Sequence, residues 1–321
     1  MAISRPSEIK PKSTISVLIY GQPSIGKTTL GCSAANAVLF DFDGGVNRIH
    51  PAHMIDTVQV ESWEQVQEAL NELASPEFAN IRTIVIDTFG KMLNCMEAYI
   101  MAKFPKFRMG NGGLAVKGYG ERKIMFKRFL SELEARRYNV IFIAHDKEDN
   151  DGDRTKIRPL VSGTAGAELL QELDLVGYMF ANNNRRRLAF NLNDNYLTKN
   201  SAHLPDMDVP EVVSADGSST STNSFIEDVV FAKVREDRQK AADLRNEYNK
   251  VMTDSLAAIQ AANTCDELNA LLDTFKKAPV MHDSSLRQGQ ALNARARQIG
   301  AKYNKAQGKY TPVTEASNEN V

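Results

Sequence analysis

Short apolar runs alternate with amphipathic stretches over roughly the first two hundred residues. Four runs rich in β-branched residues cover Ser16–Gly21, Ala37–Asp41, Thr83–Asp87 and 139–144. They are too short and unbroken for a half-exposed sheet, so they predict strands of a parallel sheet covered on both faces. The alternation with helical stretches predicts an α/β doubly wound domain.

The stretches between the strands carry helix signals. Ser62 and Gln65 stand at the spacing of a capping box, which predicts that a helix begins there. The periodicity predicts three helices, over about 62–73, 91–102 and 119–137. Later apolar runs predict further strands at 175–180, 187–191 and near 196–199.

The composition changes after residue 205. Residues 206–224 are rich in Pro, Ser, Thr, Asp and Gly, which indicates a linker or a long surface loop. Residues 225–308 carry only helical periodicity, with a second capping-box pair at Thr264 and Glu267. We therefore expect five parts: an N-terminal segment (1–14), an α/β core (15–205), the linker (206–224), a helical C-terminal region (225–308) and a disordered tail (309–321).

Composition excludes several classes of protein. The 321 residues are 42% apolar and 25% charged, an ordinary globular mixture rather than that of a disordered or fibrous chain. Lys plus Arg (39) nearly balance Asp plus Glu (40), so a nucleic-acid surface must be a local patch; residues 231–310 hold 14 basic against 9 acidic side chains. The three cysteines lie far apart, which argues against structural zinc. No apolar run is long enough to span a membrane, so we expect a soluble, cytoplasmic protein without a membrane partner.

Residues 21–29 read Gly-Gln-Pro-Ser-Ile-Gly-Lys-Thr-Thr and match the P-loop pattern Gly-x-x-x-x-Gly-Lys-Ser/Thr. The match follows a predicted buried strand and precedes a helical run, as a phosphate-binding loop requires. Backbone N–H groups and the helix N-terminus would face the phosphates, Lys27 would reach the β- and γ-phosphates, and Thr28 would bind Mg²⁺. The alternative is a glycine-rich turn with a surface lysine. The motif predicts ATP and Mg²⁺ as cofactors and the following nucleotide-binding residues: Gly21, Pro23, Ser24, Ile25, Gly26, Lys27, Thr28 and Thr29.

Polar residues follow three of the predicted strands, at the edge of the sheet where the P-loop also lies. Asp87 ends one strand and is the second candidate ligand of Mg²⁺. Asp41 and Asp43 share one side of another strand end, where one of them could activate the attacking water or simply form a turn. His145 follows a further strand and could sense the γ-phosphate as a neutral imidazole, or be a solvated strand end.

In this order the motifs resemble the RecA-superfamily ATPases. The resemblance is greatest to the single-domain, phage-encoded RecA-like recombination proteins, often described as phage nucleotide-binding AAA proteins. Six stretches carry it: 21–29, 40–45, 83–88, 139–148, 163–176 and 198–205. It implies a RecA-like P-loop NTPase core with a mostly parallel sheet, to which the C-terminal helical region is added. It also implies an ATP site between the protomers of a ring or filament.

The resemblance implies catalytic roles for four residues. Lys27 belongs to the P-loop, and Asp43 takes the place of the family's water-activating glutamate. His145 takes the place of the γ-phosphate sensor, which is usually Gln in that family. Lys199 resembles the first lysine of a Lys-Asn-Lys stretch that reaches the neighbouring subunit's γ-phosphate, although Ser201 stands where the second lysine would be.

Two segments resemble the family's DNA-binding loops. Residues 103–117 take the place of the first loop and 146–166 that of the second, and both are basic and glycine-containing. Basic groups for phosphates beside aromatic rings for bases favour binding of single strands without sequence preference. We expect both loops to be mobile without DNA; the alternative is an ordinary solvated loop. The candidate DNA-binding residues are Lys103, Phe104, Lys106, Phe107, Arg108 and Lys117 in the first and Lys147, Arg154, Lys156 and Arg158 in the second.

These observations favour an ATP-dependent recombination or annealing protein that binds single-stranded DNA and hydrolyses ATP with Mg²⁺. Its expected partners are single-stranded DNA, further copies of the chain and a phage or host single-strand-binding protein. If the chain is phage-encoded, it would act in the cytoplasm of an infected cell. The alternatives are a ring helicase or motor on the same core, and a non-catalytic nucleotide switch that binds a protein partner.

Overall fold

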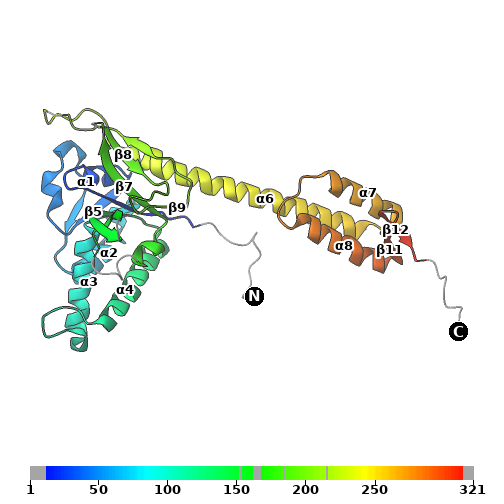
Figure 1. Ribbon diagram of the computed structural model, residues 1–321, viewed down its shortest axis with the longest axis horizontal. Helices are drawn as coiled ribbons and strands as arrows, with labels where there is room; N and C mark the ends of the chain where they lie inside the picture. Colours follow the sequence, from blue (N-terminus) through cyan, green and yellow to red (C-terminus); the bar gives the residue numbers. More distant parts are fainter. Residues whose placement is uncertain (1–11, 152–153, 162–167, 184, 215, 314–321) are drawn as a thin grey trace. The chain divides into compact units, whose positions relative to one another are not determined.

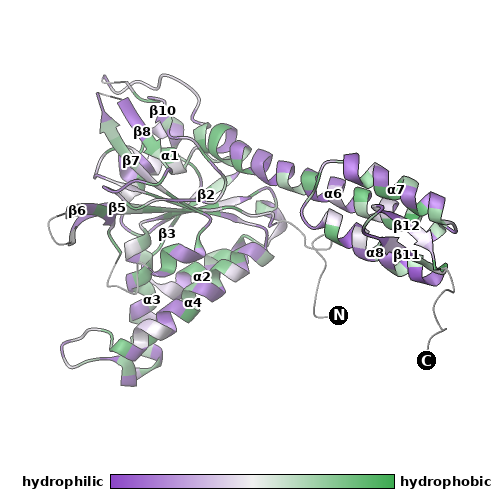
Figure 2. Cartoon of the chain, turned by 45° about the vertical axis from the view of Figure 1, so that its right-hand side comes forward, coloured by the Kyte–Doolittle hydropathy of each residue, from purple (hydrophilic) through white to green (hydrophobic). Residues whose placement is uncertain are grey.

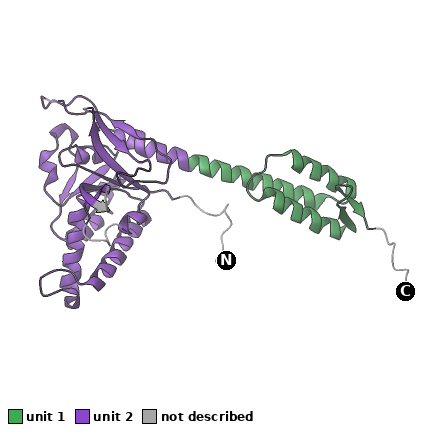
Figure 3. Cartoon of the chain, in the orientation of Figure 1, with its two compact units in different colours: residues 1–11, 239–321 green, residues 12–238 purple. Residues whose placement is uncertain are grey.

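The computed structural model describes residues 12–151, 154–161, 168–183, 185–214 and 216–313. The chain divides into two compact units (Figure 3). The core unit is Lys12–Arg238. The C-terminal unit is Gln239–Val321 together with Met1–Pro11, of which residues 239–313 are described.

A mostly parallel sheet forms the centre of the core unit (Figure 1). Its strands are β1 (Ser16–Gly21), β2 (Ala37–Asp41), β3 (Thr57–Gln59), β4 (Thr83–Asp87), β5 (Asn139–Asp151), β6 (Arg154–Pro159), β7 (Leu175–Asn182), β8 (Arg185–Ala189), β9 (Lys199–Asn200) and β10 (Met207–Val209). Their order is β10-β8-β7-β1-β5-β4-β2-β3, and the neighbours from β7 to β3 are parallel. The remaining strands pair antiparallel, with β6 on β5 and β9 on β7. The predicted α/β fold is confirmed.

Helices cover both faces of this sheet. The longer helices are α1 (Lys27–Gly31), α2 (Trp63–Glu72), α3 (Phe89–Lys103) and α4 (Val116–Ala135), and the short ones are η2 (Gly45–Arg48), η3 (Pro51–His53), η4 (Pro76–Phe78), η5 (Pro105–Phe107) and η6 (Leu170–Glu172). Successive strand residues face opposite sides, so Leu18 packs with residues of α2, α3 and α4, and Val17 packs with residues of α1. Because both sides are buried, the strands read as unbroken apolar runs. The predicted capping box of Ser62 and Gln65 begins α2.

Of the two expectations for residues 206–224, a linker or a surface loop, the structure has an exposed loop at 216–222 within a segment that belongs to the core unit and does not link the two units. Met207 lies in β10, which extends the sheet beside β8, and both Met207 and Val212 are buried. The Asn223 amide donates a hydrogen bond of 2.6 Å to the Thr29 carbonyl of α1. The polar composition therefore belongs to a segment that packs against the helix following the P-loop.

The C-terminal unit contains helices and a β-hairpin. The π-helix η7 (Ile226–Phe231) belongs to the core unit and leads into α6 (Ala232–Ala261), whose residues from Gln239 on belong to the C-terminal unit. α6 is followed by α7 (Cys265–Lys277), α8 (Ser284–Gln298) and the strands β11 (Ala301–Asn304) and β12 (Lys309–Pro312). The helices carry alternating hydrophilic and hydrophobic residues (Figure 2), and Ile259, Leu268, Leu292 and Tyr310 form a small core. The predicted capping box of Thr264 and Glu267 begins α7. The expected disorder from residue 309 is wrong for Lys309–Pro312, while residues 314–321 and 1–11 lie outside the described part.

Among the described residues, no helix has the length and apolar character needed to cross a membrane.

Candidate nucleotide site

The P-loop connects β1 to α1 through two positions that require glycine. A Cβ on Gly21 would lie 2.1 Å from the Met179 carbonyl oxygen of β7, so the close approach of the two strands excludes any side chain. Gly26 has φ +96° in the left-handed region and directly precedes α1. Between them Pro23 and Ser24 are exposed and Ile25 is buried. The loop therefore turns so that α1 begins at Lys27.

Lys27 is folded back onto its own loop. Its side chain is only 5% exposed, and Nζ donates hydrogen bonds to the carbonyls of Gly21 (2.8 Å) and Gln22 (2.7 Å). Burial lowers the pKa of this amine, and the carboxylates of Asp87 and Asp146 only partly oppose that shift. An anionic phosphate in the loop would supply the countercharge that the buried ammonium needs.

Thr28 and Asp87 are in contact and are the residues that could hold Mg²⁺. The Thr28 hydroxyl donates to Asp87 Oδ2 at 2.6 Å, and Asp87 is only 4% exposed. Burial raises the pKa of Asp87 to about 6; the Thr28 bond opposes this, and the charges of Asp43 and Asp41 add to it. A cation bound here would offset the cost of burying the Asp87 charge and would reduce its repulsion by Asp41 and Asp43. No group of three or more His, Cys, Asp and Glu residues in the described part could hold a metal alone. That fits Mg²⁺, which commonly combines one or two carboxylates with substrate phosphates.

The two aspartates after β2 have different roles. Asp41 is buried and accepts hydrogen bonds from the backbone N–H groups of Gly45 (2.9 Å), Val46 (3.0 Å) and Asp43 (3.2 Å), so it forms the turn. Asp43 Oδ1 is buried but accepts no hydrogen bond from any described residue. The Arg48 guanidinium lies 3.6 Å from the same oxygen, as an ion pair beyond hydrogen-bond distance, and the Arg48 side chain is 70% exposed. Asp43 therefore retains the capacity to bind a water molecule.

His145 lies beside the P-loop at the level where β5 pairs with the end of β1, opposite Gly21. Its Nδ1 is buried and has no hydrogen-bond partner within the residues described. Burial, followed by the charge of Lys27, lowers the pKa of His145, which favours the neutral imidazole. A neutral ring can donate one hydrogen bond to a phosphate oxygen.

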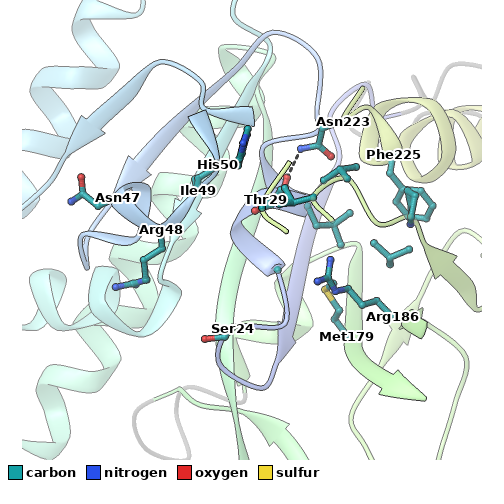
Figure 4. Close-up of a pocket in the computed structure, with 17 residues that line it drawn as sticks. Ser24, Thr29, Asn47, Arg48, Ile49, His50, Met179, Arg186, Asn223 and Phe225 are labelled. Carbon is teal, nitrogen blue, oxygen red and sulfur yellow. Dashed lines mark hydrogen bonds between the residues drawn. The ribbon is translucent and has the colours of Figure 1, made fainter. Parts of the chain in front are cut away.

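Two adjoining cavities follow from this arrangement. One has a volume of 210 Å³ and brings together Lys27, Thr28, Asp43, Asp87 and His145. The other has a volume of 390 Å³ and is lined by P-loop residues, the segment after β2, and Arg186 and Asn223 (Figure 4). The two cavities adjoin, because five residues line both of them: Ser24, Gly26, Thr29, Arg48 and Ile49.

Sequence reasoning missed several residues of the larger cavity. Asn47, Arg48 and His50 follow the turn after β2, and Arg186 comes from β8. Arg186 lies beside Met179 (Figure 4), and its Nη1 is 3.6 Å from where a Cβ on Gly26 would be. The run of three arginines at 185–187 was the available signal for Arg186. No sequence pattern indicates Asn223, because its partner Thr29 lies 194 positions earlier in the chain.

The model of an AAA domain family matches residues 13–202, which is more than half of the chain. The chain belongs to this AAA-domain family of P-loop NTPases. The predicted P-loop ATPase class is thereby confirmed. No curated protein matches the sequence.

Lys199 lies away from the nucleotide cavities of its own AAA domain. It pairs with Val176 near the start of β7, whereas the P-loop follows the opposite end of the neighbouring strand β1. Its amine donates to the carbonyls of Gln171 (2.7 Å) and Leu173. Lys199 is thus absent from the site in cis, and an action on a neighbouring subunit would require these two hydrogen bonds to break.

The first candidate DNA-binding segment, residues 103–117, is closed by backbone hydrogen bonds between its two sides. The Ala115 N–H donates to the Phe107 carbonyl at 2.7 Å and the Met109 N–H donates to the Gly113 carbonyl at 2.8 Å, so the backbone pairs with itself. Phe104 is 38% exposed and packs edge-on against Phe107. The exposed basic residues of this segment are Lys103, Lys106, Arg108 and Lys117. The amines of Lys103 and Lys106 lie over the rings of Phe104 and Phe107.

The described part of the second candidate segment is a β-hairpin rather than the expected irregular loop, and its mobility without DNA stays a prediction. β5 continues past the sheet and pairs with β6, placing Lys147 opposite Arg158, Asp149 opposite Lys156 and Asp151 opposite Arg154. Cross-strand partners and alternate residues share a face. All four predicted basic positions therefore lie on one face of this hairpin, with two carboxylate positions among them. Only the backbone of Arg154 is described, and residues 152–153 and 162–167 lie outside the described part.

Proposed function

We propose that this protein is a Mg²⁺-dependent ATPase that binds single-stranded DNA and acts in recombination or annealing. The observation that carries the ATPase proposal is the 210 Å³ cavity, where Lys27, the Thr28–Asp87 pair and the unbonded carboxylate oxygen of Asp43 converge. A nucleotide switch without hydrolysis would not need a carboxylate oxygen with no hydrogen bond from the described residues at this point.

The two cavities accommodate different parts of ATP. The triphosphate would lie on the P-loop with Lys27 between the β- and γ-phosphates, and the 390 Å³ cavity beside it would take the ribose and base. Mg²⁺, when bound at Thr28 and Asp87, neutralises charge on the phosphates. Asp43 would orient and deprotonate the attacking water, and neutral His145 would donate a hydrogen bond to the γ-phosphate.

One strand connects the proposed ATP site with a proposed DNA surface. His145 and Lys147 are two residues apart on β5, and Lys147 is on the basic face of the β5–β6 hairpin. A γ-phosphate that favours one position of His145 would therefore also favour one position of the hairpin. Such differential binding is the way in which ATP could change affinity for DNA.

The finer parts of the proposal rest on the resemblance described above. They are the affiliation with phage RecA-like proteins, a cytoplasmic setting in an infected cell, and assembly into a ring or filament with Lys199 acting in trans. Single-stranded DNA would bind the 103–117 tip through exposed Phe104 and the neighbouring lysines. A phage or host single-strand-binding protein remains the proposed protein partner.

The deciding experiment measures ATP turnover with and without single-stranded DNA. We expect Mg²⁺-dependent turnover that DNA stimulates, and a loss of about a hundredfold or more in Lys27→Ala because the buried cation opposite the phosphates is gone. Asp87→Asn should weaken Mg²⁺-dependent nucleotide binding. Lys91→Ala is the matched control, since Lys91 is exposed on α3.

Each other outcome has a distinct meaning. Wild-type turnover in Lys27→Ala would contradict the assignment of the ATP site. Turnover with strand displacement would favour a helicase, and nucleotide binding without turnover would favour a switch. Turnover that DNA leaves unchanged would retain the ATPase and reject the DNA-dependent function.

A further inference from the structure

The last part of the C-terminal unit is basic and lacks acidic residues. From Ser284 to Val313 the chain contains no Asp or Glu. It contains six basic residues in that range: Arg287, Arg295, Arg297, Lys302, Lys305 and Lys309. The preceding helices α6 and α7 are mixed in charge, so the excess of positive charge is confined to α8 and the β11–β12 hairpin.

Two of these six residues serve the packing of the unit. Arg287 donates to the Tyr248 hydroxyl at 3.0 Å. Arg295 donates to the Ala262 carbonyl and to Asn263 Oδ1, both at 2.8 Å, and so ties α8 to the end of α6. Their guanidinium groups have structural partners that account for them.

The other four are exposed and have no carboxylate partner in residues 239–313. Arg297 lies in the last turn of α8, Lys302 on β11, Lys309 on β12, and Lys305 in the turn between the strands. Elsewhere in the unit lysines are interspersed with acidic residues; Lys276, for example, lies 3.9 Å from Asp273. We call Arg297, Lys302, Lys305 and Lys309 the hairpin surface.

The hairpin holds these lysines in a fixed arrangement. Tyr303 pairs with Tyr310 on one face, where Tyr310 is buried and exchanges backbone hydrogen bonds with Asn269 of α7. Lys302 and Lys309 belong to the opposite, solvent-facing side, in diagonal positions whose separation is typically about 7–8 Å. Tyr303 itself is 39% exposed and lies on the face of Tyr310, away from Lys302 and Lys309.

We propose that the hairpin surface binds the phosphate backbone of a nucleic acid. Exposed cations on a paired hairpin and the adjoining helix end, with no carboxylate partner among residues 239–313, match the chemistry of a polyanionic strand. This binding needs neither the ATP site nor the two basic segments of the core unit. It assigns the C-terminal unit a nucleic-acid contact of its own.

The test uses the full chain without nucleotide and measures binding of a labelled oligo(dT) strand, and of a duplex of the same length, over a series of salt concentrations. The test variant is Lys302→Gln/Lys305→Gln/Lys309→Gln. The matched control is Lys250→Gln/Lys276→Gln/Lys277→Gln, which removes the same charge from exposed positions of α6 and α7 in the same unit. Melting temperatures show whether both variants fold.

The test variant should bind tenfold to about a hundredfold more weakly at roughly 0.1 M salt. Its slope of log affinity against log salt should fall by about 2 for the single strand, since each lost phosphate contact contributes about 0.7. The control should stay within about twofold of the wild type. Replacing the same three lysines by arginine should keep the affinity.

An unchanged slope in the folded test variant would overturn the proposal and leave the surface for an acidic protein partner. An equal loss in the control would also overturn it, because net charge alone would then explain binding. If the test variant binds only the single strand or only the duplex more weakly, the proposal is supported and the form of nucleic acid that binds is identified. If ATP turnover proves independent of DNA while the hairpin effect persists, only the function proposed for the core unit fails.

Discussion

At the scale of single residues, hydrogen bonding separates the roles of two like side chains. Asp41 and Asp43 are two positions apart, yet Asp41 accepts hydrogen bonds from three backbone N–H groups while one buried oxygen of Asp43 accepts none from the described residues. The three bonds use most of the acceptor sites of Asp41 and fix it in the turn, whereas the Asp43 oxygen can still accept a hydrogen bond from a water molecule. This difference assigns the proposed base role to Asp43.

Asp43→Asn should lower ATP turnover while leaving nucleotide affinity nearly unchanged. An amide has the shape of the carboxylate but cannot take the proton of the attacking water, and general-base catalysis is typically worth about a hundredfold or more in rate. Single-turnover hydrolysis and a separate nucleotide-binding titration measure the two quantities. A collapse of affinity with turnover would mean that Asp43 holds metal or structure instead of water.

Asp87 should make the ligand-free protein less stable at neutral pH than at acid pH. Its pKa rises from 3.8 to about 6 on folding, so the folded state binds this proton more tightly than the unfolded state does. The destabilisation is therefore absent below about pH 4 and complete above about pH 6, where it is on the order of 3 kcal/mol. Asp87→Asn removes the charge and should unfold at higher temperature than the wild type at about pH 8.

The advantage of Asp87→Asn should shrink to nearly nothing at about pH 4, because the wild-type carboxyl is then protonated as well. Thermal melts of both proteins at the two pH values measure this. If Asp87→Asn is less stable than the wild type at both pH values, the Asp87 charge does not destabilise the ligand-free fold.

At the scale of elements, the β5–β6 hairpin shows how pairing arranges charge. Its strand residues alternate in charge and are poor in β-branched types, a composition that favours a loop. The register nevertheless places the basic positions together, and Asp149 lies 3.5 Å from Arg158 on that same face. Glu148 lies on the opposite face.

Two single substitutions that remove the same charge should therefore differ in effect. Asp149→Asn frees Arg158 on the basic face and should tighten binding of single-stranded DNA several-fold, whereas Glu148→Gln on the other face should change it little. Fluorescence anisotropy at low and moderate salt compares them. Equal tightening by both would indicate that only net charge matters and that the proposed face is not the contact.

At the scale of the whole molecule, two roles are open to Lys199: one within its own chain and one at the ATP site of a neighbouring subunit. Its bonds to the carbonyls of Gln171 and Leu173 make it a structural residue in the single chain. The resemblance implies that it completes a neighbour's ATP site. Mixed assemblies distinguish these two roles.

Subunits carrying Lys199→Ala, mixed with subunits carrying Asp43→Asn, should recover some of the ATP turnover that each lacks alone. At a mixed interface the first subunit contributes an intact Asp43, and the second contributes Lys199. Turnover is measured over a range of mixing ratios, with assembly checked by light scattering. A lowered melting temperature in Lys199→Ala without any recovery, although the subunits assemble, would leave Lys199 only its role within the chain.

The features that the sequence alone determined depend on few neighbouring residues. The P-loop and the two capping boxes each require residue types at a spacing of a few positions, and the buried strands require only unbroken apolar runs. A turn or a helix start is stabilised largely within its own segment, and an unbroken apolar run indicates a buried strand without specifying which strands lie beside it. These predictions therefore agree with the structure.

Only the tertiary structure decided which distant residues meet. It brought Arg186 of β8 beside Gly26, packed Asn223 of the expected linker on Thr29, and placed Lys199 away from the nucleotide cavities of its own chain. It also paired β5 with β6 and gave the turn to Asp41 rather than Asp43. The free energy of such contacts depends on segments that the fold alone brings together, so no spacing along the chain encodes them.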